Sequence, residues 1–509
     1  MRDFHLLRMS LIAALLLPLS PVSAAPKAAF DANTPVTLDP LSAHRALTGE
    51  RDWRQPDYSA QDGTLGWNEK TFETPKGLEK RVGFWVDIYT KYDTSQGVVH
   101  DAENVDMVYE VVDFRDLDQL GLTAMLKEKM KRQMVDDAKK RAQRTLEKVA
   151  SAKSPFGLTP AQRRVWTYFS HDPDPEKFAK AMNPQRLRFQ LGQKNRMRSA
   201  IFLSGRYLED FEQVFREQGL PVELTRLVFV ESSFNVLARS KVGASGLWQL
   251  MPGTAKPHRV MSPAVDGRNH PLTATRIAAK LLASNYKMLG SWPLAVTGYN
   301  HGPAGVRQIV ERYGTSNLTD LVENVRSRAS FGFASRNFYA SFLAAYHVEK
   351  NADRYFPGIT WSKKFDSEDL KLPQTIKYAD LLGWFGRDDN KLQILNPHLT
   401  WRVRRGHGIP AGTSVAIPSE KYSQALMALG RRGRAVASDT VKTNPARAAE
   451  PVPAGRQSRS KKKVHRVSRG ENLSRIARVY GVEVKALLQA NNLEMGAAIL
   501  PGQRLRIPH

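Results

Sequence analysis

The sequence contains no cysteine among its 509 residues. This absence excludes disulfide scaffolds, thiolate metal sites and cysteine nucleophiles. It also excludes a lipid attached to an N-terminal cysteine, so we expect no lipid anchor. An apolar run of the roughly 20 residues that cross a bilayer is missing as well, so we expect no transmembrane segment.

Acidic residues are scarce relative to basic ones. There are 50 Asp and Glu against 76 Lys and Arg, which gives a net charge of +26. Such a charge favours a polyanionic neighbour: nucleic acid, an anionic membrane or an acidic wall polymer. Hydrophobic residues make up 41% and charged residues 25%, a balance typical of globular protein, and the length predicts two to four domains.

The N-terminal residues have the order of a secretory signal. Arg2 and Arg8 precede the apolar stretch Leu11–Leu17, and Val22–Ala24 has the small residues of a cleavage site. We therefore expect a signal peptide over residues 1–24 and an exported protein, periplasmic or associated with the cell wall. Export argues against a nucleic-acid partner despite the charge.

The body of the chain changes character near residue 186. We expect residues 25–185 to form an α+β region of unassigned role, with strands near Phe84–Thr90 and Asn104–Val112 and a helix over Leu117–Ala150. Residues 186–356 have helical periodicity interrupted by Gly-rich and Pro-containing loops. The overall fold class is therefore predicted to be multidomain and mainly α.

The C-terminal part contains a basic linker and an internal repeat. Residues 419–463 are expected to be a disordered linker, because 431–463 hold ten Lys and Arg, only two acids and no aromatic residue. Gly386 and Asn396 recur as Gly481 and Asn491, which indicates two copies of one βααβ module over 371–418 and 464–508. Chance similarity between two helix–turn–strand segments is the alternative.

Glu231 is the first candidate for chemistry. Leu220, Leu224, Leu227 and Val228 form an apolar helical stripe, and Glu231 continues it four residues after Leu227. A carboxyl group on such a stripe is desolvated, which raises its pKa towards that of a general acid. Most glutamates in such a position are instead paired or extend to the surface, so position alone does not decide.

Two Gly-rich segments follow it. Residues 243–255 contain Trp248, Gln249 and Met251 among glycines that allow backbone to approach a ligand closely. Residues 295–305 end a helix in a Gly-rich turn and present Tyr299 and Asn300. Together with Glu231, these patches predict a cleft for a sugar polymer.

Carboxylates are few in this part of the chain. Between Glu231 and Glu311 the only other one is Asp266, which we expect to cap a turn. Ordinary glycosidases need two carboxylates. A single glutamate must obtain its second group elsewhere, and the acetamido oxygen of an N-acetyl sugar can supply it.

Three motifs then resemble a known family. Glu231–Ser232, Gly243–Pro252 and Gly298–Pro303 resemble the motifs of the soluble-type lytic transglycosylase domain of the goose-type lysozyme superfamily. Residues 464–508 look like a LysM domain. The combination resembles membrane-bound lytic transglycosylases of the D type, which implies a lysozyme-like catalytic domain over 186–356, a LysM domain over 464–508 and a divergent LysM-like copy over 371–418.

The resemblance implies roles for individual residues. Glu231 matches the family's sole catalytic acid and base, which cleaves the bond between N-acetylmuramic acid and N-acetylglucosamine and leaves a 1,6-anhydromuramoyl end. The partner is then the peptidoglycan glycan strand, and no metal or cofactor is needed. The positions matched to substrate binding are Ser240, Gln249, Met251, Tyr299 and Asn300.

Other positions depart from the family pattern. Gly298 and His301 replace two alanines, and Phe333–Tyr339 lacks the acid that many relatives carry there. His301 is interpreted as a residue of the cleft rim. In the LysM-like repeat, Thr375 and Ile376 replace two groove residues, so the resemblance assigns no sugar-binding role to 371–418 and the question stays open. The groove residues implied for 464–508 are Gly470, Glu471, Leu473, Asn491 and Leu493.

Two other functions stay open at this point. A hydrolase of the goose-type lysozyme kind would share the fold, but it needs a positioned water and usually a second carboxylate near the first. A non-catalytic wall-binding protein would depend on the LysM domain and would have no need of a buried acid at Glu231.

Overall fold

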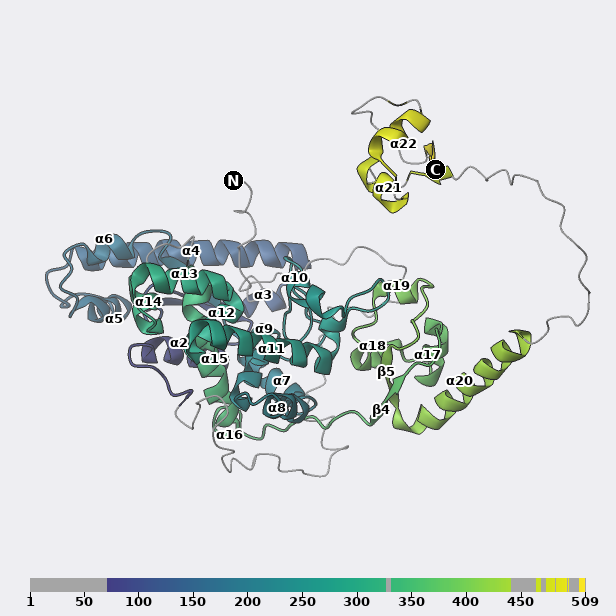
Figure 1. Ribbon diagram of the computed structural model, residues 1–509. Coiled ribbons are helices and arrows are strands. Elements are labelled where there is room, and N and C mark those ends of the chain that lie inside the picture. The colour runs from purple at the N-terminus through teal and green to yellow at the C-terminus, as the bar shows by residue number, and fades with distance from the viewer. Residues whose placement is uncertain are drawn as a thin grey trace, which may run out of the picture. The chain divides into compact units, whose positions relative to one another are not determined.

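The structure is a computed structural model that describes residues 71–325, 331–440, 464–467, 473–480, 482–491, 493 and 503–508. The chain divides into two compact units, residues 1–437 and 438–509. Helices dominate both, which confirms the mainly α fold class (Figure 1). None of the described helices is long and apolar enough to span a bilayer. The expected signal peptide lies outside the described residues.

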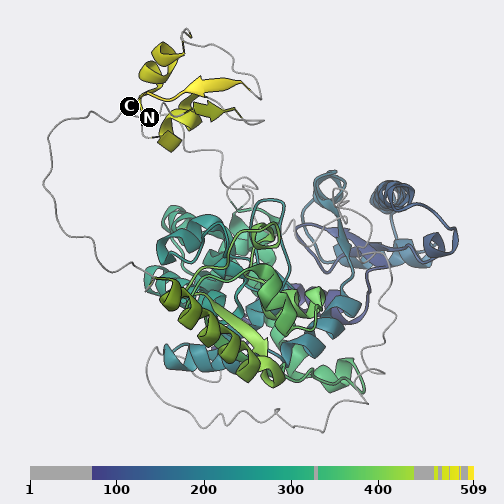
Figure 2. The same cartoon turned by 90° about the vertical axis from the view of Figure 1, so that its right-hand side faces the viewer.

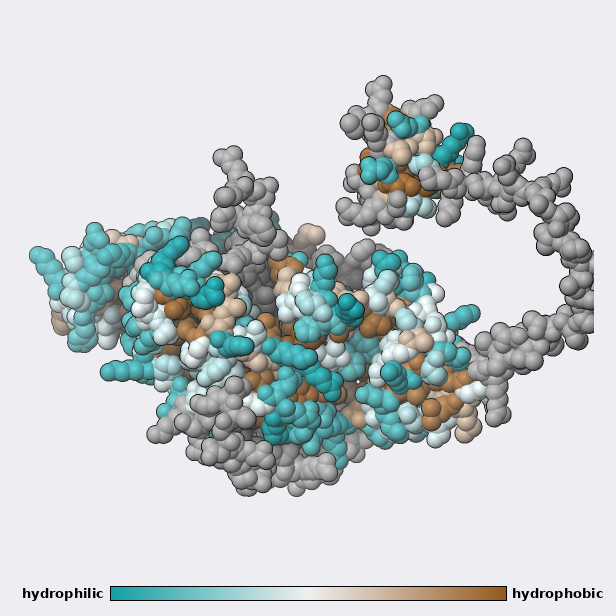
Figure 3. Space-filling view, viewed as in Figure 1, coloured by the Kyte–Doolittle hydropathy of each residue, from teal (hydrophilic) through white to brown (hydrophobic). Residues whose placement is uncertain are grey.

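A small sheet organises the N-terminal region. Its antiparallel order is β2-β1-β3, with β1 at Gln96–Asp101, β2 at Val108–Asp113 and β3 at Leu187–Leu191. Helix α4 (Ala124–Ala150) packs on it, and α5 (Pro160–Phe169) and α6 (Lys177–Ala181) adjoin α4. The residues that α4 buries share one helical face: Ala138, Ala142, Leu146 and Val149. Hydrophilic residues cover the outer surface at this end of the unit (Figure 3).

Two expectations for this region were wrong. Residues 84–90 are not a strand but belong to α2 (Glu79–Thr90), because Val82, Trp85 and Tyr89 recur at helical spacing and are all buried. Helix α2 packs along α15 (Phe333–Lys350), so it is part of the helical core. The region also extends past residue 185, since β3 pairs with β1 and completes the sheet.

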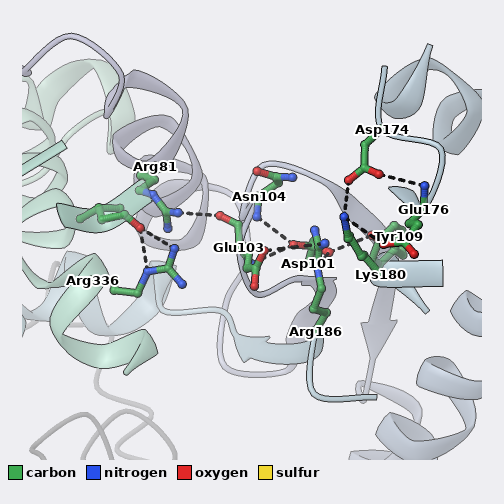
Figure 4. A network of polar contacts seen from close by, with 11 residues as sticks. Arg81, Asp101, Glu103, Asn104, Tyr109, Asp174, Glu176, Lys180, Arg186 and Arg336 are labelled. Carbon is green, nitrogen blue, oxygen red and sulfur yellow. Dashed lines mark hydrogen bonds and ion pairs between the residues drawn. The ribbon is translucent and has the colours of Figure 1, made fainter. Parts of the chain in front are cut away.

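A polar network joins the sheet to the helical core (Figure 4). One carboxylate oxygen of Asp101 accepts hydrogen bonds from the N–H groups of Glu103 and Asn104, each at 2.8 Å. The other accepts from Arg186 at 2.8 Å. Arg81 of α2 donates to the Glu103 carbonyl oxygen at 2.6 Å. The β1–β2 turn is thereby fixed against α2.

Helices predominate from residue 194 to residue 356, as the helical periodicity predicted. Its main helices are α7 (Lys194–Ser204), α8 (Leu208–Glu217), α9 (Leu227–Glu231), α11 (Pro271–Leu289), α12 (Trp292–His301), α13 (Pro303–Tyr313), α14 (Leu318–Asn324) and α15. One apolar cluster runs through them and through α2, with Trp85, Trp248 and Phe342 fully buried. Helix α15 contacts α2, α9 and α12, so it is the central helix.

The internal repeat is confirmed as two βααβ modules. The first consists of β4 (Ser367–Lys371), α17 (Tyr378–Trp384), α18 (Asp389–Leu395) and β5 (Ser414–Pro418), with one additional short helix, α19 (Trp401–Arg404), between α18 and β5. The second consists of β6 (Val464–Arg466), α21 (Leu473–Tyr480), α22 (Val484–Ala490) and β7 (Arg504–Arg506), the yellow elements of Figure 2. In each module the outer strands pair antiparallel.

The repeated asparagine performs the same task in both modules. Asn396 donates to the Ala416 carbonyl oxygen and accepts from the Ala416 N–H, both at 2.8 Å. Asn491 makes the same exchange with Arg506 at 2.7 and 2.6 Å. The shared spacing noted in the sequence therefore reflects a bond between the second helix and the last strand.

The predicted start of the disordered linker, residue 419, was wrong. Residues 419–440 form helix α20 (Ser419–Thr440), because Ala425 and Leu429 lie one turn apart and are buried with Leu381 and Ile417 of the first module. Residues 441–463, the rest of the expected linker, lie outside the described residues.

A loop of the helical core, residues 263–266, is bonded to the first module. Val265 forms an isolated antiparallel bridge with Leu399. The Asp266 N–H donates to the His398 carbonyl oxygen at 2.7 Å, and the Thr400 N–H donates to the Ala264 carbonyl oxygen at 3.0 Å. Residues 263–266 are thus held by backbone hydrogen bonds to the module.

Candidate active site

Glu231 is the last residue of α9, and its side chain is only 7% exposed. The apolar stripe before it is buried as predicted, although residues 222–226 form a 3-10 turn before α9 begins. Just after Glu231, Ser233 and Phe234 have φ values of 50° and 56°. This left-handed turn ends the helix at the carboxyl group and directs the Phe234 ring onto Phe229, with centroids 4.8 Å apart.

The carboxyl group of Glu231 is isolated. Burial raises its pKa to about 8, and burial is the sole cause of the shift. Its Oε1 atom has no hydrogen-bond partner among the described residues. The group is therefore mostly protonated at neutral pH, and it can give its proton to an oxygen brought next to it.

A buried arginine anchors the segment that carries Glu231. Arg226, at the end of the 3-10 turn, forms ion pairs with Glu212 of α8 and with Glu349 of α15, the latter at 3.2 Å. All three side chains are buried. Sequence reasoning missed this triad, because Glu349 lies 123 residues beyond Arg226 and no local pattern links them.

The Gly-rich loop, residues 243–250, folds back on the segment that precedes it. The Ser240 hydroxyl accepts a hydrogen bond from the Ala244 N–H at 2.9 Å. The Gln249 side-chain amide donates to the carbonyl oxygens of Ala238 and Gly246, at 3.2 and 2.7 Å. Two predicted site residues, Ser240 and Gln249, thus also hold the loop in shape. Met251, next in the chain, is half-buried.

Arg268 supports this loop from behind. Its guanidinium donates to the carbonyl oxygens of Gly243 and Leu250 at 2.7 and 3.0 Å. Gly246 lies against its backbone, since a Cβ there would be 2.2 Å from the Arg268 carbonyl oxygen, and its φ of 79° also requires glycine. Asp266 accepts from the Arg268 N–H at 3.2 Å and pairs with its guanidinium, which confirms the predicted turn cap.

Tyr299 connects the Gly-rich loop to Glu231. Its hydroxyl donates to the Trp248 carbonyl oxygen at 2.7 Å. Burial, with a further contribution from the charge of Glu231, raises the pKa of Tyr299 well above its usual value. The hydrogen bond to Trp248 holds the phenol against the Gly-rich loop. Trp248 is itself fixed by a 2.8 Å hydrogen bond from its indole nitrogen to the Thr275 hydroxyl.

Asn300 and His301 share a partner that sequence reasoning missed. The Ser335 hydroxyl on α15 lies 3.4 Å from Asn300 Oδ1 and 2.9 Å from His301 Nδ1. The Asn300 Nδ2 atom is buried and has no partner among the described residues. Ser335 falls within the stretch searched for an acid, so a search for hydroxyl residues there would have found it.

The structure therefore groups most of the predicted site residues. Tyr299 is bonded directly to the Gly-rich loop, the charge of Glu231 contributes to the raised pKa of Tyr299, and Asn300 follows Tyr299 on α12. Ser240 and Gln249 are linked to the same loop through its backbone. The site thus contains a buried, mostly protonated carboxyl group in the same helical core as this loop and α12, which suits acid catalysis on a polar polymer.

The predicted LysM groove is described only in part. Gly470 and Glu471 lie outside the described residues. Leu473 is buried in the module's core, and Leu493 packs against that core. The Asn491 amide is engaged with Arg506, as described above. These side chains hold the module together, so their contact with a glycan stays a prediction.

Comparison with known proteins gives two family matches. Residues 212–321 match the transglycosylase SLT domain, and residues 465–508 match the LysM domain. The first match contains all six residues predicted for the catalytic site: Glu231, Ser240, Gln249, Met251, Tyr299 and Asn300. The chain thus combines an SLT domain with a C-terminal LysM domain.

Individual relatives are similar to this chain over part of its length. The chain is 26% identical to membrane-bound lytic murein transglycosylase D of Escherichia coli over 298 residues, which cover 57% of this chain and 61% of that protein. It is 38% identical over 96 residues to a putative tributyltin chloride resistance protein of Alteromonas, covering 18% and 46% of the two chains. The chain thus spans less than two thirds of these relatives.

A solved structure gives a weaker similarity. The soluble lytic transglycosylase SLT70 of Escherichia coli is 21% identical, with coverage of 46% of this chain and 35% of that chain and a TM-score of 0.25.

Proposed function

We propose that this chain is a peptidoglycan lytic transglycosylase, which cleaves the β-1,4 bond between N-acetylmuramic acid and N-acetylglucosamine and forms 1,6-anhydromuramoyl ends. The observation that carries the proposal is the isolated, buried carboxyl group of Glu231 inside an SLT domain. No charged group contributes to its raised pKa. In a two-carboxylate hydrolase, the charge of a second acid would lie close enough to Glu231 to contribute to its pKa.

One residue can perform both proton transfers. Protonated Glu231 gives its proton to the glycosidic oxygen as the bond from that oxygen to the muramoyl anomeric carbon breaks. The acetamido oxygen of the same sugar stabilises the positive charge on that carbon. The Glu231 carboxylate then takes the proton of the muramoyl 6-hydroxyl, and the 6-oxygen bonds to the anomeric carbon. No water is consumed, and Glu231 ends protonated.

The surrounding residues position the substrate and the acid. The Tyr299 hydroxyl donates its proton to the Trp248 carbonyl oxygen, so its own oxygen is left to accept a hydrogen bond from the protonated acid or from a sugar hydroxyl. The unpartnered Nδ2 of Asn300 is a donor available to a sugar oxygen or carbonyl group. Ser240, Gln249 and Met251 form the wall that takes the N-acetyl sugar.

The wall-binding part follows from the LysM match. We assign residues 464–508 to peptidoglycan binding and the basic stretch after residue 440 to tethering near an anionic wall. A weak second site on the same chain raises the effective concentration of the active site at the polymer. The protein is then exported and acts in the periplasm or at the cell wall, in wall turnover or remodelling.

The test is mass spectrometry of the soluble products released from purified sacculi, with Glu231→Gln as the inactive control. We expect anhydromuramoyl ends from the wild type and no product from the variant. Reducing muramic ends would instead indicate that water attacks, as in a lysozyme-like hydrolase. Absence of any soluble product from the wild type would leave only a wall-binding function.

A further inference from the structure

A pocket lies between the helical core and the first βααβ module, outside the candidate active site. Its volume is about 580 Å³, within the range of sites for small ligands. The loop from Arg259 to Gly267 and the first turns of α11 form one side, and β4, His398 and residues 410–414 of the first βααβ module form the other. None of the six residues predicted for catalysis lines it.

The pocket is electropositive. Arg259 and Arg276 line it, both are exposed, and neither forms an ion pair with a carboxylate in the described part of the chain. Leu272 and Thr273, in the first turn of the 19-residue helix α11, also line the pocket, so the positive end of the helix dipole lies beside it. Asp369 is the single carboxylate in the lining. The balance favours an anionic group.

The two histidines of the lining add no charge at neutral pH. His270 caps α11 by accepting from the Thr273 N–H at 3.4 Å, and burial lowers its pKa. The His398 ring lies 4.9 Å away, with a pKa lowered by burial to about 3. His398 Nε2 bonds the Ser414 carbonyl oxygen at 3.0 Å. The attraction for an anion therefore comes from the two arginines and the helix terminus.

The other side chains that line the pocket offer hydroxyl groups and apolar surface, which a peptide attached to a sugar can contact. Ser262, Thr273 and Thr413 supply hydroxyl groups, while Val260 and Leu272 supply apolar surface. The planar guanidinium of arginine can bind a carboxylate through two parallel hydrogen bonds, whereas the ammonium group of lysine acts as a point charge. The peptide stems of peptidoglycan carry free carboxylates next to an amide backbone, and they match this combination.

We propose that this pocket binds peptidoglycan through a carboxylate of a peptide stem, as a holding site separate from the catalytic cleft. The inference rests on the proposed function for the identity of the polymer. The loop that lines the pocket also carries Arg268, which holds Gly243 and Leu250. A bound stem would therefore contact the same loop that supports the wall of the active site.

Hydrogen exchange of the full chain tests the proposal, with Glu231→Gln present so that the ligand is not consumed. Three probes are compared: a disaccharide–tetrapeptide, the same disaccharide without its peptide, and inorganic phosphate. We expect the stem-bearing probe alone to protect amides in 256–276 and 408–418. The double change Arg259→Gln with Arg276→Gln should weaken this protection about tenfold or more, because charge-assisted bonds are lost.

A matched control removes the same charge elsewhere. Arg144→Gln with Arg163→Gln changes two exposed arginines of α4 and α5 and should leave the protection unaltered. The proposal is overturned if the stem-bearing probe leaves the pocket unprotected, if the pocket double variant binds it as tightly, or if phosphate protects equally. Anhydromuramoyl products from the wild type report on the proposed function independently, so the two can fail separately.

Discussion

The guanidinium of Arg268 donates a hydrogen bond to the carbonyl oxygen of Gly243 at 2.7 Å, which joins the turn at residues 266–269 to the start of the Gly-rich loop. The same guanidinium reaches Leu250 at the other end. One side chain thus fixes both ends of the segment that forms a wall of the active site.

Arg268→Lys tests this support. Lysine keeps the charge opposite Asp266, but its single ammonium group cannot replace the arginine fork that reaches two carbonyl oxygens and a carboxylate. We expect at least a tenfold fall in kcat and a loss of about 1–3 kcal/mol in the free energy of unfolding, because buried carbonyl groups are left unpaired. Turnover of soluble glycan strands and thermal unfolding measure the two effects.

The control for that change is Arg307→Lys, in an exposed pair with Glu311. Exposed pairs contribute little, so activity and stability should both stay within error of the wild type. Full activity in Arg268→Lys would contradict the supporting role.

The raised pKa of Glu231 predicts a pH dependence of activity. The protonated carboxyl is the acid, so kcat/KM should fall as the pH rises through about 8. Substrate cleavage followed from about pH 3 to 9 covers this limb and the ordinary glutamate range. A fall centred near the ordinary glutamate pKa of about 4.3 would contradict a buried acid.

The same shift predicts a pH dependence of stability. Between the unfolded pKa and the folded pKa the native state holds the proton and the unfolded state does not, so the free energy of unfolding falls as pH rises through this window. Glu231→Gln removes the effect. The variant should match the wild type at pH 4 and exceed it at pH 8, by an amount on the order of 4 kcal/mol for the shift to about 8. Denaturant unfolding of both proteins at the two pH values measures the difference, and equal stability at pH 8 would argue against it.

Asn491 is predicted to matter for the fold of the LysM module. Its amide bonds both backbone groups of Arg506, so Asn491→Ala should destabilise the module by about 1–3 kcal/mol and reduce sacculus binding as a consequence. Cleavage of soluble strands should be unchanged. Sacculus pull-down and thermal unfolding are measured together, because a residue that only contacts glycan would lower binding without changing unfolding.

Asn396→Ala is the matched variant in the first module. It removes the same exchange, with Ala416, and should destabilise the first unit while sacculus binding by the LysM module persists. Loss of binding in Asn396→Ala alone would indicate that the first module contacts the wall.

The sequence by itself determined the candidate acid, the motifs around it and the repeat. These features are local, since an apolar stripe places Glu231 on a buried face and closely spaced glycines mark the loop that follows it. The recurrence of Asn396 as Asn491 is likewise visible in the spacing, because each asparagine closes the same short module.

Only the tertiary structure decided what surrounds these residues. Residues 84–90 contain the aromatic residues of a strand, yet they form a helix because α15 offers an apolar surface for one helical face. Residues 419–440 form a helix for the same reason, against the first module. The triad of Arg226, the bonds of Arg268 and the hydroxyl of Ser335 join positions far apart in the chain. The pKa of Glu231 belongs with them, since desolvation depends on every element packed around the carboxyl group and not on its neighbours in sequence.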